Sequence, residues 1–260
     1  MVPAALAIAW LAFGCEPTVL IGSCAEPSGA GGGAGASASL EAVSMPWSTG
    51  FEDGLCGYHA ARGFCYARHG ASLEIVESPT AHTGKFAAAF TVNADDSTPD
   101  RSQARCVREG VMPASAYYGA WYFIPALATN ADNWNLFHFL GGTSEADPEP
   151  HPLWDISLAN VGGKLELSVY DFLHGKPRAT SGVEPLPIGS WFRLQIKIVR
   201  SAQANGEIIV LQDGKVALHL VDLVTDDTEW GQWFAGNFVK ALEPRLSTLY
   251  VDDITLSEGP

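Results

Sequence analysis

Three side chains of this sequence, those of Arg105, His138 and Tyr170, are of types that can hold an anion, accept a proton and donate one. A guanidinium keeps its positive charge at neutral pH, an imidazole titrates close to neutral pH, and a phenol can deliver a proton to a leaving group. Together they would suit acid–base chemistry beside a developing negative charge. They lie far apart in the sequence, so only the fold can bring them together.

The local pattern predicts where two of these side chains point. Successive side chains of a strand alternate between its faces, so Gln103, Arg105 and Glu109 would share one face of the stretch 103–109. His138 stands between two phenylalanines and would face opposite to both. A histidine with large apolar neighbours is more often a hydrogen-bonded core residue than a base, and both interpretations stay open.

From Phe51 onward the sequence predicts strands and no helix. Runs of β-branched and aromatic residues alternate with Gly, Pro and Asn/Asp breaks, and Asp213-Gly214 is a strong hairpin signal. The expected strands are 72–76, 85–92, 104–109, 117–125, 135–140, 154–158, 165–172, 191–200, 207–212, 215–220 and 249–256. Short strands without βαβ spacing predict an all-β fold, a two-sheet antiparallel β-sandwich.

The composition allows one well-packed domain and argues against one class of partner. The chain has 260 residues, of which 47% are hydrophobic and 17% charged. Its formal net charge of −14, with no block of Lys and Arg to offset it, disfavours nucleic acid as a partner. We expect a monomer.

Residues 1–24 predict an export signal. One apolar run ends at Cys15, and Leu20-Ile21-Gly22-Ser23-Cys24 resembles a bacterial lipobox. We therefore expect an exported protein that is secreted or held at the cell surface as an outer-membrane lipoprotein, with the lipid on either cysteine as its only membrane contact. The first Lys or Arg is Arg62, so the basic start of a signal peptide is missing, and a buried N-terminal helix is the alternative.

Residues 25–45 are rich in Gly, Ala and Ser, which predicts a flexible tether before a folded domain over residues 46–260. Export favours disulfide pairing within the domain. We expect a Cys56–Cys65 bond, because these residues are close in sequence, with Cys106 buried as a free thiol. A Cys65–Cys106 bond is the alternative.

Four short stretches lie near the two ends of the domain. They are Phe51-Glu52-Asp53-Gly54, the segments 75–79 and 82–87, and Leu249-Tyr250-Val251-Asp252-Asp253-Ile254-Thr255-Leu256. These stretches resemble jelly-roll carbohydrate-binding modules. The resemblance implies a structural calcium held by Glu52, Asp252 and Asp253, with the backbone carbonyl of Lys85 as a further ligand. The alternative is that these carboxylates accept backbone N–H bonds at strand ends.

The middle of the domain carries Tyr118-Gly119-Ala120-Trp121-Tyr122-Phe123-Ile124-Pro125, Trp134-Asn135-Leu136-Phe137-His138-Phe139 and Gly189-Ser190-Trp191-Phe192-Arg193. These stretches resemble the concanavalin A-like sandwiches of polysaccharide lyases, the heparin and alginate lyase kind. The resemblance implies a concanavalin A-like jelly roll. It also implies β-elimination on an acidic glycan, in which Arg105 neutralises a uronate carboxylate, His138 removes the C5 proton and Tyr170 protonates the leaving oxygen.

Two departures from the lyase pattern weaken the catalytic interpretation. The closing strand motif in which Tyr and Lys alternate is replaced by Trp233-Phe234-Ala235-Gly236-Asn237-Phe238, and His138 has Leu136 rather than Gln two residues before it. A glycoside hydrolase is less favoured still, because no expected strand carries two alternating glutamates. Glu145, Asp147 and Glu149 alternate, but Pro148 and Pro150 mark their segment as a loop.

Aromatic residues beside expected loops are candidates to bind a sugar. An exposed indole stacks on a sugar ring and offers an N–H donor, whereas a buried indole packs the core. The candidates for a glycan-binding surface are Trp134, Trp154, Trp230 and Trp233, together with Gln103, whereas Trp121 and Trp191 are expected in the core.

Three functions remain open. The leading expectation is a surface protein that binds a polysaccharide or surface glycan. The alternatives are a polysaccharide lyase and a structural or adhesive surface protein.

Overall fold

Alternation of apolar and polar residues builds strands that each bury one face. In β11 (Lys164–Asp171) the side chains of Leu165, Leu167 and Val169 are buried, while the residues between them are partly exposed. The computed structural model describes residues 19–20, 42–59, 63–77, 81–94, 101–130, 134–142, 150–180, 182–226 and 228–260. All eleven expected strands are present there, some longer than expected.

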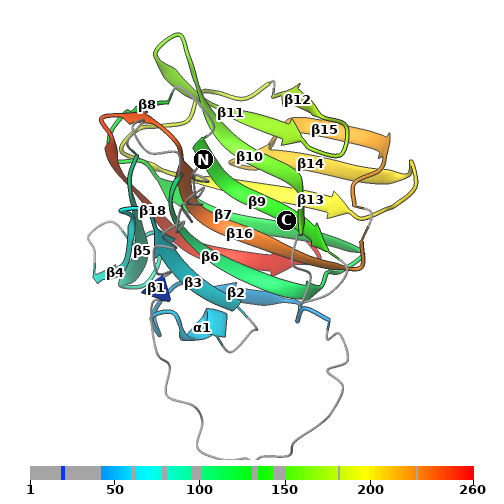
Figure 1. Cartoon of the computed structure of the whole chain (residues 1–260), viewed down its shortest axis with the longest axis horizontal. Coiled ribbons are helices and arrows are strands. Elements are labelled where there is room, and N and C mark those ends of the chain that lie inside the picture. Colours follow the sequence, from blue (N-terminus) through cyan, green and yellow to red (C-terminus); the bar gives the residue numbers. More distant parts are fainter. Residues whose placement is uncertain are drawn as a thin grey trace, which may run out of the picture.

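The strands form two antiparallel sheets that stack face to face (Figure 1). The first sheet has the order β1 (Val19–Leu20), β3 (Gly63–Arg68), β6 (Ser102–Val111), β16 (Trp230–Val239), β9 (Trp134–Gly142), β10 (His151–Val161), β11 and β12 (Lys176–Ala179). The second sheet has the order β15 (Lys215–Leu223), β14 (Gly206–Gln212), β13 (Trp191–Val199), β7 (Ser115–Phe123), β18 (Leu246–Ser257), β5 (Phe86–Asn93) and β4 (Ser72–Glu77), and β2 (Trp47–Thr49) pairs with β18. The two-sheet β-sandwich is thus confirmed.

Smaller elements complete the described part of the chain. Strands β8 (Thr129–Asn130) and β17 (Leu242–Glu243) pair with each other, and the short helix α1 (Cys56–His59) lies at the end of the sandwich near β2 and β3 (Figure 1). One hydrophobic core fills the space between the sheets. Its largest fully buried aromatic side chains are Trp134, Trp154, Trp233, Tyr58, Tyr118, Tyr122, Phe51, Phe90, Phe137 and Phe192.

Strand β16 was not expected, because its glycines resemble breaks. It nevertheless lies in the middle of the first sheet, between β6 and β9. A Cβ atom at Gly236 would lie 2.4 Å from the carbonyl oxygen of Ala104, so the close approach of β6 requires glycine at this position. The glycine therefore permits the strand rather than ending it.

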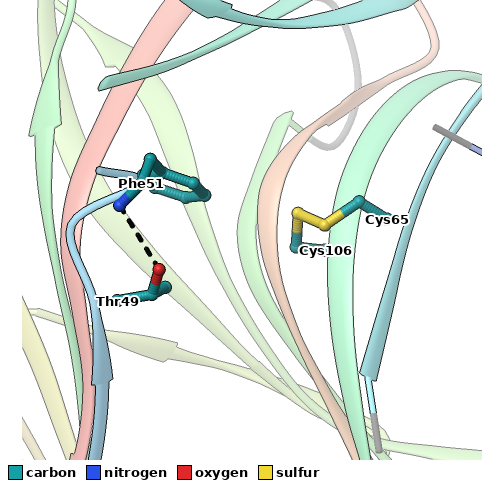
Figure 2. The surroundings of a disulfide bond; sticks show 4 residues. All are labelled: Thr49, Phe51, Cys65 and Cys106. Carbon is teal, nitrogen blue, oxygen red and sulfur yellow. Dashed lines mark hydrogen bonds between the residues drawn. A yellow bond between two sulfur atoms is a disulfide. The ribbon is translucent and has the colours of Figure 1, made fainter. Parts of the chain in front are cut away.

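The disulfide joins Cys65 to Cys106, so the expected Cys56–Cys65 bond is wrong. Cys65 on β3 is directly opposite Cys106 on β6, with the two Cα atoms 4.0 Å apart, whereas Cys56 belongs to α1. Cys56 is itself disulfide-bonded, to neither of these two residues. Figure 2 shows the Cys65–Cys106 bond between the two strands, with the buried ring of Phe51 pointing toward it. The bond is consistent with an extracytoplasmic protein.

Most of the predicted signal and tether lies outside the described residues. Of residues 1–24, Val19 and Leu20 are described, and they pair with Ala67 and Tyr66 of β3. Near the expected start of the domain, the backbone N–H of Val43 donates to the carbonyl oxygen of Val111 at 2.9 Å. In the part of the chain that the structure describes, no helix is long and apolar enough to cross a membrane.

Candidate functional site

Three neighbouring strands bring His138, Asp155 and Tyr170 into one row on the outer face of the first sheet. In the register of β9, β10 and β11, His138 is opposite Asp155, and Asp155 is opposite Tyr170. The residues before and after His138, Phe137 and Phe139, are buried in the core. The alternation predicted from the sequence therefore holds, and the imidazole points away from the second sheet.

His138 is anchored by a buried carboxylate. Its Nδ1 atom is hydrogen-bonded to Oδ1 of Asp155, whose side chain is 4% exposed, while the His138 side chain is 15% exposed. An ionised carboxylate can only accept a hydrogen bond, so an ionised Asp155 would require the proton on Nδ1 and leave the lone pair on Nε2. The Nε2 atom makes no hydrogen bond to the described residues.

The surroundings keep the His138 ring neutral at neutral pH. Burial lowers the pKa of the imidazole from its usual 6.5, and the hydrogen bond to Asp155 opposes this effect only in part. The positive charges of Arg105 and Arg101 lower the pKa further. A neutral imidazole with a free nitrogen is the form that can accept a proton.

Arg105 lies on the same outer face, two strands away on β6, but it is largely covered. It is 5% exposed, and its guanidinium stacks on Phe238 of β16, with Cζ 3.9 Å from the ring centre. Its Nη2 atom donates to Oδ1 of Asn135 at 2.9 Å. Burial lowers the pKa of Arg105, while Tyr66 and Asp155 oppose that effect.

An irregularity in β9 brings Asn135 to this face. Between Asn135 and Phe137 the pairing with β10 shifts by one residue at Leu136, so Asn135 and His138 face the same side although they are three positions apart. The Nδ2 atom of Asn135 is buried and has no hydrogen-bond partner among the residues that the structure describes. A strict period of two would have placed Leu136 beside His138, and sequence reasoning therefore missed Asn135.

A groove of about 610 Å³ opens on this face. Asp155 and Phe172, which both contact His138, line it together with Tyr170. Tyr170 is 37% exposed, and its ring packs edge-on against Phe172 at 4.7 Å. The other polar residues of the lining are Arg101, Asn130, Ser157, Asn160 and Ser168. Hydroxyls, amides and one exposed cation suit a hydroxylated ligand that carries negative charge.

The structure thus places the three proposed catalytic residues on one face of the sheet, but at different depths. His138 and Tyr170 flank Asp155 on adjacent strands, so their backbones are about 10 Å apart. Arg105 sits deeper, beneath other side chains. Gln103 belongs to the edge of the same face, where its Oε1 accepts a hydrogen bond from the Tyr66 hydroxyl at 3.0 Å.

The expected tryptophan surface is wrong. Trp134, Trp154, Trp230 and Trp233 are at most 2% exposed and cannot stack on a sugar. The strands that carry Trp134 and Trp154 begin earlier than expected, and Trp230 and Trp233 belong to β16, which was not expected. Trp134, Trp154 and Trp233 are part of the hydrophobic core. Two of the N–H groups are bonded inside the protein, Trp134 to Oδ1 of Asn237 and Trp154 to the carbonyl oxygen of Thr225.

The three proposed calcium ligands already accept hydrogen bonds from the segment 82–86. Oε1 of Glu52 accepts the backbone N–H groups of Lys85 and Phe86, and Oδ2 of Asp252 accepts those of His82 and Thr83. Oδ2 of Asp253 bonds to Nδ1 of His82 at 2.6 Å. Among the described residues, no group of three His, Cys, Asp or Glu is arranged to hold a metal. The bonds to Glu52 and Asp252 match the alternative in which these carboxylates accept backbone N–H groups, and calcium here stays a prediction.

Asp155 was not recognised from the sequence as a partner of His138. Asp155 lies on another strand from His138, and the register between the two strands cannot be read from the sequence. The available signal was an acidic residue, Asp155, on the strand that follows the candidate base, whereas its position opposite His138 depends on the register.

Comparisons with known proteins show the fold but no family. No family model matches this sequence, and no curated protein is similar to it in sequence. Among solved structures, it is similar to the endo-β-1,4-glucuronan lyase of the fungus Trichoderma reesei, with a TM-score of 0.58 and 14% identity over 75% of this chain and 90% of that one.

Two further solved structures are alginate lyases. The one from Chlorella virus has a TM-score of 0.54 and 12% identity, covering 82% of this chain and 98% of that one. The one from Aplysia kurodai has a TM-score of 0.52 and 10% identity, covering 81% and 97%. At such low identity the likeness establishes the architecture alone. The described chain folds as a concanavalin A-like jelly roll of the kind that polysaccharide lyases use.

Proposed function

We propose that this protein is a polysaccharide lyase that cleaves an acidic glycan by β-elimination in the groove on the first sheet. The observation that carries the proposal is the geometry at His138: Nδ1 is bonded to Asp155, Nε2 makes no hydrogen bond to the described residues, and a groove lined by Tyr170 lies beside the ring. Burial, which lowers the pKa of His138, favours the neutral imidazole that a base requires. The similarity of the fold to glucuronan and alginate lyases supports the choice of a uronate substrate.

Each residue of the site has one role in the proposed reaction. Nε2 of His138 takes the C5 proton of a uronate, the bond between C4 and the bridging oxygen breaks, and a double bond forms between C4 and C5. The Tyr170 hydroxyl gives its proton to the departing oxygen. Arg105 and the exposed Arg101 stabilise the negative charge that develops on the carboxylate. The two proton-transfer residues then exchange protons with water to restore the starting state.

The test is the appearance of the unsaturated sugar. The purified protein is incubated with polyglucuronate, alginate and polygalacturonate, and the new double bond is followed by its near-ultraviolet absorbance. We expect turnover of at least one uronan, and a loss of roughly 10²- to 10⁴-fold in kcat for His138→Ala and Tyr170→Phe. The control is His219→Gln, because His219 is exposed on the second sheet. If kcat were unchanged in both His138→Ala and Tyr170→Phe, the proposal would be refuted.

A second function, binding of the glycan without cleavage, is favoured by one observation. The guanidinium of Arg105 is covered and stacked on Phe238, which limits its access to a substrate carboxylate. In that case calorimetry would detect uronan binding to the wild-type protein, Tyr170→Ala and Ser168→Ala would weaken it, and no unsaturated product would form.

A further inference from the structure

Asp155 lies between the proposed base and the proposed acid, and neither proton transfer requires it. We propose that Asp155 is a positioning residue, which holds the His138 ring in the tautomer with Nδ1 protonated so that Nε2 is the proton acceptor. The inference deepens the proposed function and rests on it for its catalytic consequence, whereas the tautomer itself can be observed without turnover.

The geometry leaves the imidazole little freedom. Asp155 and His138 occupy opposite positions on β10 and β9, and the Asp155 residue is 3% exposed. The His138 ring is enclosed by Phe172, edge-on with 6.3 Å between ring centres, and by Phe234 at 5.4 Å. Rotation of the ring away from Asp155 would leave a buried carboxylate without this partner, and such desolvated charges are costly. Both ring orientation and tautomer therefore follow from one hydrogen bond.

The charged and titratable groups around His138 come from four segments. Asp155 faces it from β10 and Tyr170 lies beyond on β11, while Arg105 of β6 and Arg101, just before β6, act on it through their charge. Strand β16 contributes the Phe234 ring at this position. Within the described part of the chain, Asp155 is the negative group that opposes the effect of burial and of two positive charges on the pKa of His138. Its removal should therefore lower this pKa further.

Asp155→Asn is the decisive variant, because it keeps the shape and removes the charge. An asparagine can present its N–H₂ group to Nδ1, which would favour the other tautomer and place the proton on Nε2. We expect kcat to fall by roughly 10²- to 10⁴-fold. The acid limb of kcat/KM against pH should move to lower pH, a shift that a general loss of stability would not produce. Asp155→Glu, which restores a carboxylate, should recover part of the rate.

The control is Asp222→Asn on β15, where Asp222 is exposed and has a φ of 55°, a conformation that asparagine tolerates. It should leave kcat and the pH profile unchanged. A matching loss in this variant would show that the effect of Asp155→Asn is not specific to the site, and would overturn the inference.

The closing experiment is nitrogen-15 NMR of histidine-labelled protein without substrate, with the His138 signals assigned by their loss in His138→Gln. The expected result is a protonated Nδ1 and an unprotonated Nε2 in the wild-type protein, and loss of this pattern in Asp155→Asn. A wild-type ring protonated on Nε2, or a pattern unchanged in the variant, overturns the inference. If the pattern is as expected but no uronan is cleaved, the proposed function fails while the positioning of His138 by Asp155 stands.

Discussion

Removing the Cys65–Cys106 disulfide should lower the free energy of unfolding. The size of this effect can be calculated from the length of the loop that the disulfide closes. The bond closes a loop with a sequence separation of 41 residues. The chain-entropy relation for such a loop gives about 4 kcal/mol at room temperature, because the cross-link removes extended conformations from the unfolded chain. Both cysteines are fully buried, so their substitution also alters packing.

The assay separates these two effects. The double variant Cys65→Ala/Cys106→Ala and the wild-type protein are unfolded in urea, each with and without a reductant that keeps all thiols reduced at equilibrium. Without reductant, the difference between the proteins contains the cross-link and the packing change; with reductant, it contains only the packing change. Reduction of the Cys56 disulfide affects both proteins alike and cancels.

The expected outcome is a remainder of about 4 kcal/mol after the packing difference has been subtracted, with a larger m-value for the protein that lacks the cross-link. A remainder below about 1 kcal/mol would refute the reasoning. It would mean that the bond is absent in solution, or that β3 and β6 stay together in the unfolded chain.

Two further predictions follow from buried polar groups. Asn135→Ala removes the acceptor of the Arg105 guanidinium and should lower the free energy of unfolding by about 1.5 to 3 kcal/mol, measured by urea titration, whereas a change below about 0.5 kcal/mol would show that the guanidinium has another acceptor. Burial raises the pKa of Asp252 from 3.8 to about 6, so between these values the folded protein binds more protons than the unfolded chain, and stability should fall as pH rises from 4 to 6. Relative to Asp252→Asn the fall should reach up to about 3 kcal/mol, and equal pH slopes for the two proteins would contradict the raised pKa.

Strand periodicity was sufficient to predict the fold class, because alternation of apolar and polar residues, as from Leu165 to Val169, indicates a strand with one buried face. The prediction of strands failed at β16, because a glycine in the sequence is compatible with two structures. Gly236 could end a strand or allow two backbones to approach, and only the position of Ala104 on the neighbouring strand decides between them. The disulfide was misjudged for a related reason, since closeness in sequence says nothing about register between β3 and β6.

The candidate site, like the fold, was predicted only in part. The outward direction of His138 follows from its two phenylalanine neighbours, and it was predicted. Its contact with Asp155 depends on the register of two strands, and the presence of Asn135 on the same face depends on a one-residue shift at Leu136. Neither can be read from one sequence. The tryptophans were misplaced for two reasons. The expected strands around Trp134 and Trp154 were too short, and the strand that carries Trp230 and Trp233 was not expected at all, so strand positions were taken for loop positions.

The row of His138, Asp155 and Tyr170 has a consequence for the order in which the protein folds. These residues come from β9, β10 and β11, which are consecutive in both the chain and the sheet, whereas Arg105 comes from β6 and reaches the face only after β16 has inserted between β6 and β9. Pairings between consecutive strands close short loops and are entropically cheap, while the insertion of a strand from near the C-terminus closes a long one. The proton-transfer row can therefore assemble early as a local meander. The cationic part of the site would be completed last, when β16 joins the sheet.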